Sequence, residues 1–155
     1  MRDNMTDKDF LQKAITLSKK SVESGAYPVG AVLVLNNEIV SESISDGKKL
    51  NDATSHAEIA CIREASKKLG KRDLKGAVIY SSMEPCLMCF SACYWAGVTK
   101  VVFACAKNKV SKMHYEGLHD LKEINQKNNR KIEIIQISEL EGEALQIIKE
   151  WEKPL

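Results

Sequence analysis

Two short segments, His56-Ala57-Glu58 and Pro85-Cys86-Leu87-Met88-Cys89, combine residue types that bind metals with a carboxylate that could move protons. The thiols of Cys86 and Cys89 are one helical turn apart, so at the start of a helix they would face one point. The positive helix end there favours thiolate, which is the form that binds zinc. His56 supplies a third ligand, and three protein ligands leave the fourth tetrahedral position open for water, as in catalytic zinc sites. We therefore expect one Zn²⁺ ion per chain.

Glu58 follows His56 by two residues and is the candidate catalytic residue. Zinc lowers the pKa of bound water to about 7, and hydrolysis by this water requires a nearby group that takes up and delivers protons. Each segment also has a structural alternative. Ser55 and Glu58 have the spacing of a helix capping box, and a Cys-x-x-Cys pair can serve redox chemistry or core packing. Their joint occurrence favours the zinc site.

The other cysteines, Cys61, Cys93 and Cys105, lie among apolar neighbours and are assigned to packing. Five cysteines without the spacing of a disulfide framework indicate a reducing compartment, so we expect the protein in the cytoplasm. The polar and acidic segment Met1–Asp9 has the pattern of neither a signal peptide nor a transit peptide. The apolar runs are too short for a membrane span, and we expect no membrane partner.

The hydrophobic pattern predicts a single α/β domain over residues 1–155. The predicted strands are Val29–Leu35, Glu38–Ser43, Ala77–Ser82, Lys100–Ala104 and Lys131–Ile137, the first two joined by a tight turn at Asn36-Asn37. The first predicted helix is capped at Thr6 or Asp7 and ends at Gly25. Three further helices are predicted over Ser55–Leu69, Pro85–Ala96 and His114–Asn128, and a last helix begins at Ser138. This order predicts a five-stranded mixed sheet, with a hairpin at one side, parallel strands beyond it and helices on both faces. Ligands bind at the carboxyl ends of such strands, where the helix starts at Ser55 and Pro85 lie.

The helix Cys86–Ala96 is apolar on nearly every side. Such a helix either lies deep inside a domain or forms a contact between subunits. We expect part of its surface to form a homodimer interface.

The motifs resemble the cytidine deaminase-like superfamily, within the branch that holds guanine deaminases and bacterial tRNA adenosine deaminases. The resemblance covers most of the chain and is carried by the segments Tyr27–Val32, Asn51–Glu58 and Ser81–Ala96. It implies a three-layer α/β/α fold, with His56, Cys86 and Cys89 as zinc ligands and Glu58 as the proton shuttle. It also implies that the backbone N–H groups of Ala57 and Cys86 face the substrate, and that the protein is a dimer or higher oligomer.

The expected substrate contacts depart from the family pattern. Family members commonly have an Asn eleven residues before the zinc-binding His, whereas this chain has Ser45 there, with Asp46 beside it. A hydroxyl and a carboxylate offer the ring a different set of hydrogen bonds from an amide. His114 and Tyr115, which follow the fourth predicted strand, are predicted pocket walls.

Other segments bear on the choice between the two kinds of relative. Tyr94-Trp95-Ala96 resembles guanine deaminases, but the acidic contact that those enzymes carry after the fourth strand is missing from Lys100–Lys112. Their aromatic C-terminal closure is also missing from the last residues, Glu152-Lys153-Pro154-Leu155. Against a tRNA enzyme, Ser91 replaces a usual Gly and the C-terminal helix is acidic, which would repel phosphates.

Three functions follow, of which the first is favoured. The first is hydrolytic deamination of a small aminated heterocycle, such as a nucleobase or nucleoside, with release of ammonia. The second is tRNA-specific adenosine-to-inosine deamination, although a formal net charge of only +2 is far from that of a dedicated nucleic-acid binder. The third is a zinc-stabilised binding protein without turnover.

Overall fold

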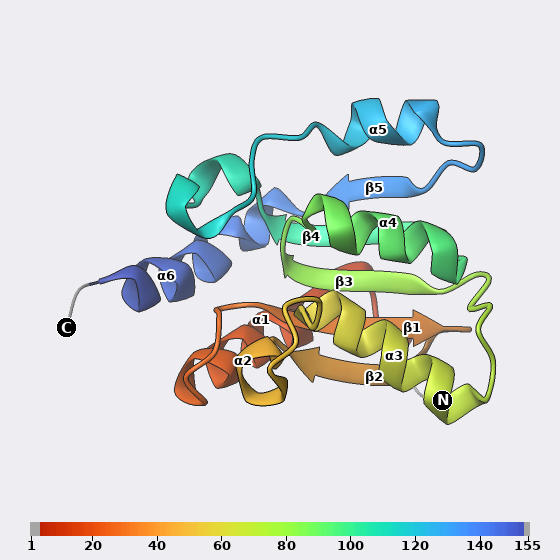
Figure 1. The fold of residues 1–155 in the computed structure, drawn as a ribbon, viewed down its shortest axis with the longest axis horizontal. Helices are drawn as coiled ribbons and strands as arrows, with labels where there is room; N and C mark the ends of the chain where they lie inside the picture. Colours follow the sequence, from red (N-terminus) through yellow and green to blue (C-terminus); the bar gives the residue numbers. More distant parts are fainter. Residues whose placement is uncertain (1–3, 154–155) are drawn as a thin grey trace.

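The computed structural model describes residues 4–153 and contains a mixed sheet of five strands in the order β2-β1-β3-β4-β5 (Figure 1). The strands are β1 (Gly30–Leu35), β2 (Glu38–Ile44), β3 (Val78–Met83), β4 (Lys100–Cys105) and β5 (Glu133–Gln136). β1 pairs antiparallel with β2 and β3, whereas β4 runs parallel to both β3 and β5. Asn36 and Asn37 both have positive φ, at 51° and 64°, as a two-residue type I′ turn requires. The predicted hairpin and the predicted parallel strands are confirmed.

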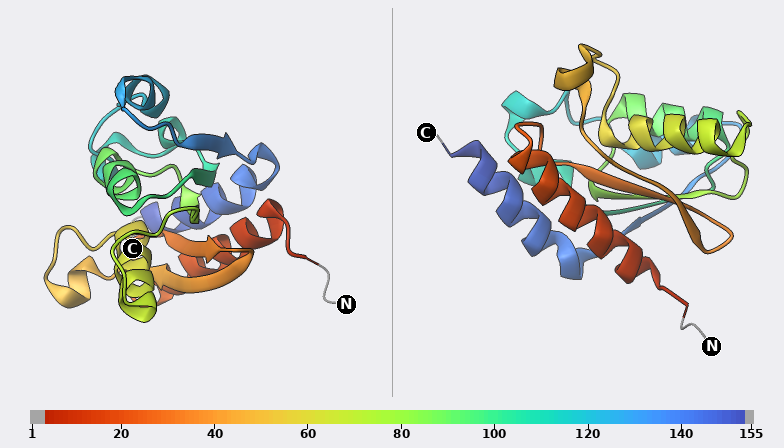
Figure 2. Two further views of the ribbon diagram at one scale, coloured as in Figure 1. Left: turned by 90° about the vertical axis from the view of Figure 1, so that its right-hand side faces the viewer. Right: turned by 90° about the horizontal axis from the view of Figure 1, so that it is seen from below.

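Helices cover both faces of the sheet and give three layers (Figures 1 and 2). On one face lie α1 (Asp7–Glu23) and α6 (Glu141–Glu152), side by side; on the other lie α3 (Ala57–Leu69), α4 (Leu87–Ala96) and α5 (Leu121–Lys127). Within β1, Ala31 and Leu33 pack into the core beneath α3 and α4, while Val32 and Val34 pack into the core beneath α1 and α6. Strands covered on both faces are apolar throughout, as the sequence of β1 is. The predicted α/β/α layering is confirmed.

Polar contacts tie the start of α1 to the centre of the sheet. Thr6 is the N-cap and forms a capping box with Asp9. The carboxylate of Asp7 accepts hydrogen bonds from the Tyr80 hydroxyl at 2.6 Å and from the Lys100 ammonium at 2.8 Å. Since Tyr80 belongs to β3 and Lys100 to β4, α1 is fixed across the parallel strands.

The predicted helix His114–Asn128 is wrong in its first half. Lys112–His114 forms a single 3-10 turn, η2, and residues 115–120 are irregular. Gly117 has a φ of 153° and Asp120 caps α5, so the helix begins only at Leu121. The short helices α2 (Gly47–Leu50) and η1 (Lys107–Lys109) were not predicted. The last helix, predicted to begin at Ser138, starts there as a 3-10 turn, η3 (Ser138–Leu140), and continues as α6 from Glu141.

The helix that carries the cysteine pair begins two residues later than predicted. Cys86 is its N-cap and α4 starts at Leu87, so Pro85 lies before the helix and not at its first position. Gly97, with a φ of 87°, ends it as predicted. Within residues 4–153, no helix is both long and apolar enough to span a membrane.

Candidate active site

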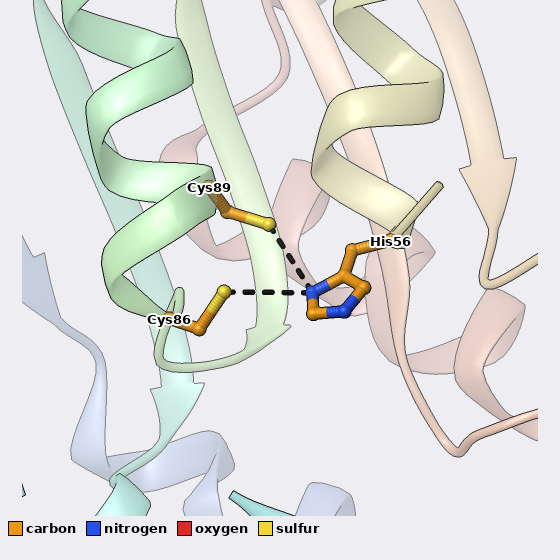
Figure 3. Close-up of side chains that lie close together, drawn as sticks. All are labelled: His56, Cys86 and Cys89. Atoms are coloured by element: carbon orange, nitrogen blue, oxygen red, sulfur yellow. Dashed lines mark hydrogen bonds between the residues drawn. The ribbon is translucent and has the colours of Figure 1, made fainter. Parts of the chain in front are cut away.

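The predicted metal ligands converge at the starts of two neighbouring helices. His56 is the N-cap of α3, Cys86 is the N-cap of α4, and Cys89 lies in the first turn of α4. Figure 3 shows the three side chains pointing at one another, with His56 Nδ1 at 3.4 Å from the Cys86 sulfur and 3.5 Å from the Cys89 sulfur. One ligand atom from each residue lies within 4.8 Å of the others. Two sulfurs and one imidazole nitrogen match the donor set of a zinc site with an open fourth position, so the residues fit the ion.

The electrostatics of the cluster favour a bound cation. A hydrogen bond from the Cys89 thiol, together with His56, lowers the pKa of the Cys86 thiol to about 4. The same contact raises the pKa of Cys89, because one negative charge disfavours a second beside it. Contact with Cys86 also raises the pKa of His56. A divalent cation would relieve this repulsion and hold both cysteines as thiolates.

Glu58 lies in the first turn of α3, beside the ligand cluster. Its side chain is only 4% exposed, and its Oε1 accepts a hydrogen bond of 2.7 Å from the Ser81 hydroxyl in β3. Burial raises the pKa of this carboxyl group. The capping-box alternative is wrong, because His56 and not Ser55 is the N-cap and the Ser55 hydroxyl donates to Asp46 instead. Glu58 is therefore directed into the site and not back along its own helix.

A cavity of about 410 Å³ opens above these groups. It is lined by Tyr27, Val29, Ser45, His56, Ala57, Glu58, Met83, Glu84, Cys86, Met113, His114, Tyr115 and Glu116. Four of the predicted substrate contacts, Ser45, Ala57, His114 and Tyr115, are therefore brought together. Asp46 is not among the lining residues, because its carboxylate accepts the hydrogen bond from Ser55 that shapes the turn before α3.

Glu116 is a cavity residue that sequence reasoning missed. It lies in the irregular segment after β4 and its Oε1 accepts a hydrogen bond of 2.7 Å from the backbone N–H of Leu87, at the start of α4. Lys100–Lys112 contains no acidic residue, and Glu116 lies four residues further on, within the segment wrongly predicted as helix. Its place directly after the predicted wall residue Tyr115 was the available signal.

A cluster of three aromatic rings was also missed. Tyr27, His114 and Trp151 have ring centroids 6.2 Å (Tyr27–His114), 5.0 Å (Tyr27–Trp151) and 4.7 Å (His114–Trp151) apart. Tyr27 and His114 line the cavity, and Trp151, from the last turn of α6, packs against both. Trp151 lies one residue before the segment Glu152-Lys153-Pro154-Leu155, in which the sequence shows no aromatic group. α6 therefore supports the cavity wall.

Comparison with known proteins agrees with this site. Residues 4–105, more than half of the chain, match the family described as the cytidine and deoxycytidylate deaminase zinc-binding region. The guanine deaminase of Bacillus subtilis is 36% identical over 122 residues, which is 78% of each chain. The tRNA-specific adenosine deaminase of Aquifex aeolicus is 37% identical over 100 residues, 64% of this chain and 66% of that enzyme, slightly under two thirds of its length.

Structural similarity extends over nearly the whole chain. The structure of a guanine deaminase from Nitrosomonas europaea superposes with a TM-score of 0.84 over 97% of this chain and 86% of that one, at 21% identity. This likeness bears on the fold alone. The sequence match and the converging His56, Cys86 and Cys89 lead to one conclusion: the chain belongs to the cytidine and deoxycytidylate deaminase zinc-binding family and is a zinc-dependent hydrolytic deaminase.

Proposed function

We propose that the protein removes the exocyclic amine of a small aminated heterocycle, a nucleobase or nucleoside, with Glu58 as the proton shuttle. The observation that carries the proposal is a buried carboxylate at the floor of a cavity whose lining includes the metal ligands His56 and Cys86. Water and the amine-bearing ring are converted to the ring carbonyl and ammonia. When bound to His56, Cys86 and Cys89, zinc supplies the activated water nucleophile.

The protein's own groups account for the proton movements. Glu58 takes a proton from the attacking water and delivers it to the ring nitrogen, then carries the second proton to the departing amine. Ser81 holds the carboxylate at one oxygen, which leaves the other for the exchange. The raised pKa of Glu58 suits this role, because a shuttle must both accept and release a proton near neutral pH. The Ser45 hydroxyl, which lines the cavity, is our candidate hydrogen-bond partner for the ring.

The cavity supports a single-molecule substrate. A volume of about 410 Å³ lies within the range of small-molecule sites. The Glu152 carboxylate accepts a hydrogen bond from the Ser111 backbone N–H, so the last turn of the acidic helix α6 contacts the loop after β4, where its charge would repel phosphates. Tyr27, 40% exposed, can stack on a heterocyclic ring.

Editing of adenosine to inosine in tRNA is the second candidate. It is favoured by the similarity to the tRNA-specific adenosine deaminase of Aquifex aeolicus. Binding of tRNA would weaken steeply with salt, because phosphate contacts release counterions. Affinity for an anticodon stem-loop at two salt concentrations therefore separates the two candidates.

The first experiment is a screen for ammonia release from purines, pyrimidines, pterins, their nucleosides and an anticodon stem-loop. We expect turnover of a free base or nucleoside by the zinc-loaded protein. The Glu58→Gln variant should keep its zinc and lose activity by about 100- to 10,000-fold, the usual contribution of a general acid–base. Release of ammonia by the variant at the parent's rate contradicts the shuttle role, and turnover of the stem-loop alone establishes the second candidate.

We also propose that two copies associate through α4, in the cytoplasm. Trp95 on this helix is 72% exposed, and aromatic side chains are enriched at protein interfaces relative to the rest of the surface. The five cysteines are all unpaired thiols, which suits a reducing compartment. Sedimentation at micromolar concentration should show a dimer, and Trp95→Lys should shift it to monomer. A monomeric parent would rule this interface out.

A further inference from the structure

The turn that carries Cys86 is joined to one wall of the cavity through Glu84. The Glu84 backbone N–H donates to the carbonyl of Cys105 at 2.8 Å, and its own carbonyl accepts from the Tyr115 hydroxyl at 2.9 Å. Its Oε1 accepts from the Lys107 backbone N–H at 3.2 Å, and its Oε2 lies 3.4 Å from the Lys107 ammonium. The backbone donor, the backbone acceptor and both carboxylate oxygens of Glu84 thus contact residues 105–115.

The charged pair at this junction is largely removed from solvent. The side chains of Lys107 and Glu84 are 12% and 13% exposed, far less than those of the surface pair Lys127 and Glu123, at 76% and 64%. Glu84 also lines both the catalytic cavity and a second cavity of about 410 Å³ that Lys107 lines on the other side. Because both charges are largely buried, loss of the Glu84 carboxylate would leave the Lys107 ammonium without its partner and would weaken the junction between the two segments.

The position of Cys86 depends on what precedes it. Cys86 has no side-chain cap, and Pro85 has no backbone N–H to donate. Glu84 is therefore the residue through which the turn before Cys86 is fixed to the sheet and loop. On the far side of Cys86, the backbone N–H of Leu87 donates to Glu116, which belongs to the same wall. Cys86 is thus held from both sides by residues of the segment 105–116.

We propose that Glu84 is a positioning residue that couples metal binding at Cys86 to the order of the cavity wall, residues 107–116. The inference rests on the metal site of the proposed function but not on its substrate. Metal binding fixes the turn, the turn fixes Glu84, and Glu84 fixes Lys107 and Tyr115. In the reverse direction, a wall closed on the substrate holds the Cys86 ligand in its binding position. Residues that orient metal ligands in this indirect way commonly change metal affinity when they are replaced.

The test compares Glu84→Ala with the surface control Glu123→Ala. Zinc affinity is measured by competition with a chromophoric chelator, and amide hydrogen exchange is followed over residues 107–116 with and without zinc. We expect Glu84→Ala to bind zinc about tenfold more weakly, the lower end of such effects. In the parent, zinc should slow exchange in residues 107–116, and this protection should be lost in Glu84→Ala and kept in Glu123→Ala.

If Glu84→Ala fails to fold, the Tyr115→Phe variant tests the same coupling. It removes only the hydroxyl that donates to the Glu84 carbonyl, so it should reduce the zinc-dependent protection in part while the ring stays in the cavity wall. Unchanged zinc affinity together with unchanged protection in either variant overturns the coupling, even if the melting temperature falls. A parent that binds no zinc contradicts the metal site itself, whereas zinc binding without ammonia release contradicts only the proposed reaction.

Discussion

At the scale of single residues, the proposed proton transfer depends on how the carboxylate of Glu58 is held. Ser81 donates to Glu58 from within β3, so the carboxylate is fixed to the rigid sheet, although it belongs to a helix. The hydrogen bond lowers the pKa of Glu58 and opposes the larger effect of burial, which raises it. The balance of the two sets the pH at which Glu58 can accept a proton.

Ser81→Ala should therefore shift the acidic limb of the pH–rate profile to higher pH. Without the Ser81 donor the charged form of Glu58 loses its stabilising hydrogen bond, and its pKa rises further. We expect activity on the acidic limb to fall roughly tenfold, since a hydrogen bond to a charged group is worth about 1.5–3 kcal/mol. The matched control is Ser82→Ala, which removes the neighbouring buried hydroxyl that accepts from the Gly30 backbone N–H. An identical shift in both variants would mean that the effect is not specific to Glu58.

The convergence of His56, Cys86 and Cys89, with Glu58 beside them, could be predicted from the sequence because these residues belong to short motifs at helix starts. The wall of the cavity could not. Tyr115 and Glu116 are placed by hydrogen bonds to Glu84 and Leu87, which are about thirty positions earlier in the chain. No local pattern reveals such contacts.

At the scale of elements, one acidic residue, Asp7, fixes helix α1 to strands β3 and β4. Burial alone would raise the pKa of Asp7, but hydrogen bonds from Lys100 and Tyr80 outweigh it and hold the pKa below its usual value of 3.8. A carboxyl group whose pKa is lowered on folding stabilises the fold at pH above its unfolded pKa. That contribution is lost as the pH falls below 3.8 through the lowered value.

Asp7→Asn should thus lower the melting temperature near neutral pH by about 2–4 °C, equivalent to roughly 1 kcal/mol after allowance for screening of this part-exposed pair. The difference from the parent should shrink as the solution is acidified, because the parent then loses the same charge. Thermal unfolding followed by circular dichroism across the acidic range measures both. Glu139→Gln, which removes an exposed partner of Lys8, should change stability little at any pH. A constant difference between Asp7→Asn and the parent at all pH values would contradict the assignment.

The five strands, the hairpin and the parallel pairing followed from the sequence, because the apolar runs of β1, β3 and β4 are those of strands covered on both faces and the turn at Asn36-Asn37 marks the hairpin. The full order of the strands in the sheet was not predicted. The helix predicted over His114–Asn128 failed for a physical reason. Leu121 and Ile124 supply helical periodicity only to its second half, and Gly117 with its positive φ interrupts the first. The helical pattern begins only at Leu121, so it does not predict a helix over residues 114–120.

At the scale of the whole molecule, the cavity mouth joins three distant parts of the chain. Tyr27 follows α1, His114 lies in the loop after β4, and Trp151 ends α6. The three rings support one another, with the Lys48 ammonium 5.6 Å above the Tyr27 ring. We expect this cluster to set how well a small ring is held.

The chain has two tryptophans, so Trp95→Phe leaves Trp151 as the only one. In this background, addition of a base that the protein turns over should change the tryptophan fluorescence. Trp151→Ala in the same background should raise KM roughly three- to tenfold with little change in kcat, as the loss of an aromatic contact of about 0.5–1.5 kcal/mol predicts. An unaltered KM, or a fall in kcat alone, would show that the cluster does not take part in binding.

The exposure of Met113 has a consequence for protein engineering. This side chain lines the cavity while 87% of its surface faces solvent, and it stands beside residues that the fold holds tightly. Its neighbours Tyr115 and Glu116 are committed to the turn and helix that carry the cysteines, whereas position 113 can be exchanged without disturbing them. Position 113 is therefore the first position to vary by saturation mutagenesis when the substrate specificity is to be changed toward bulkier or smaller rings.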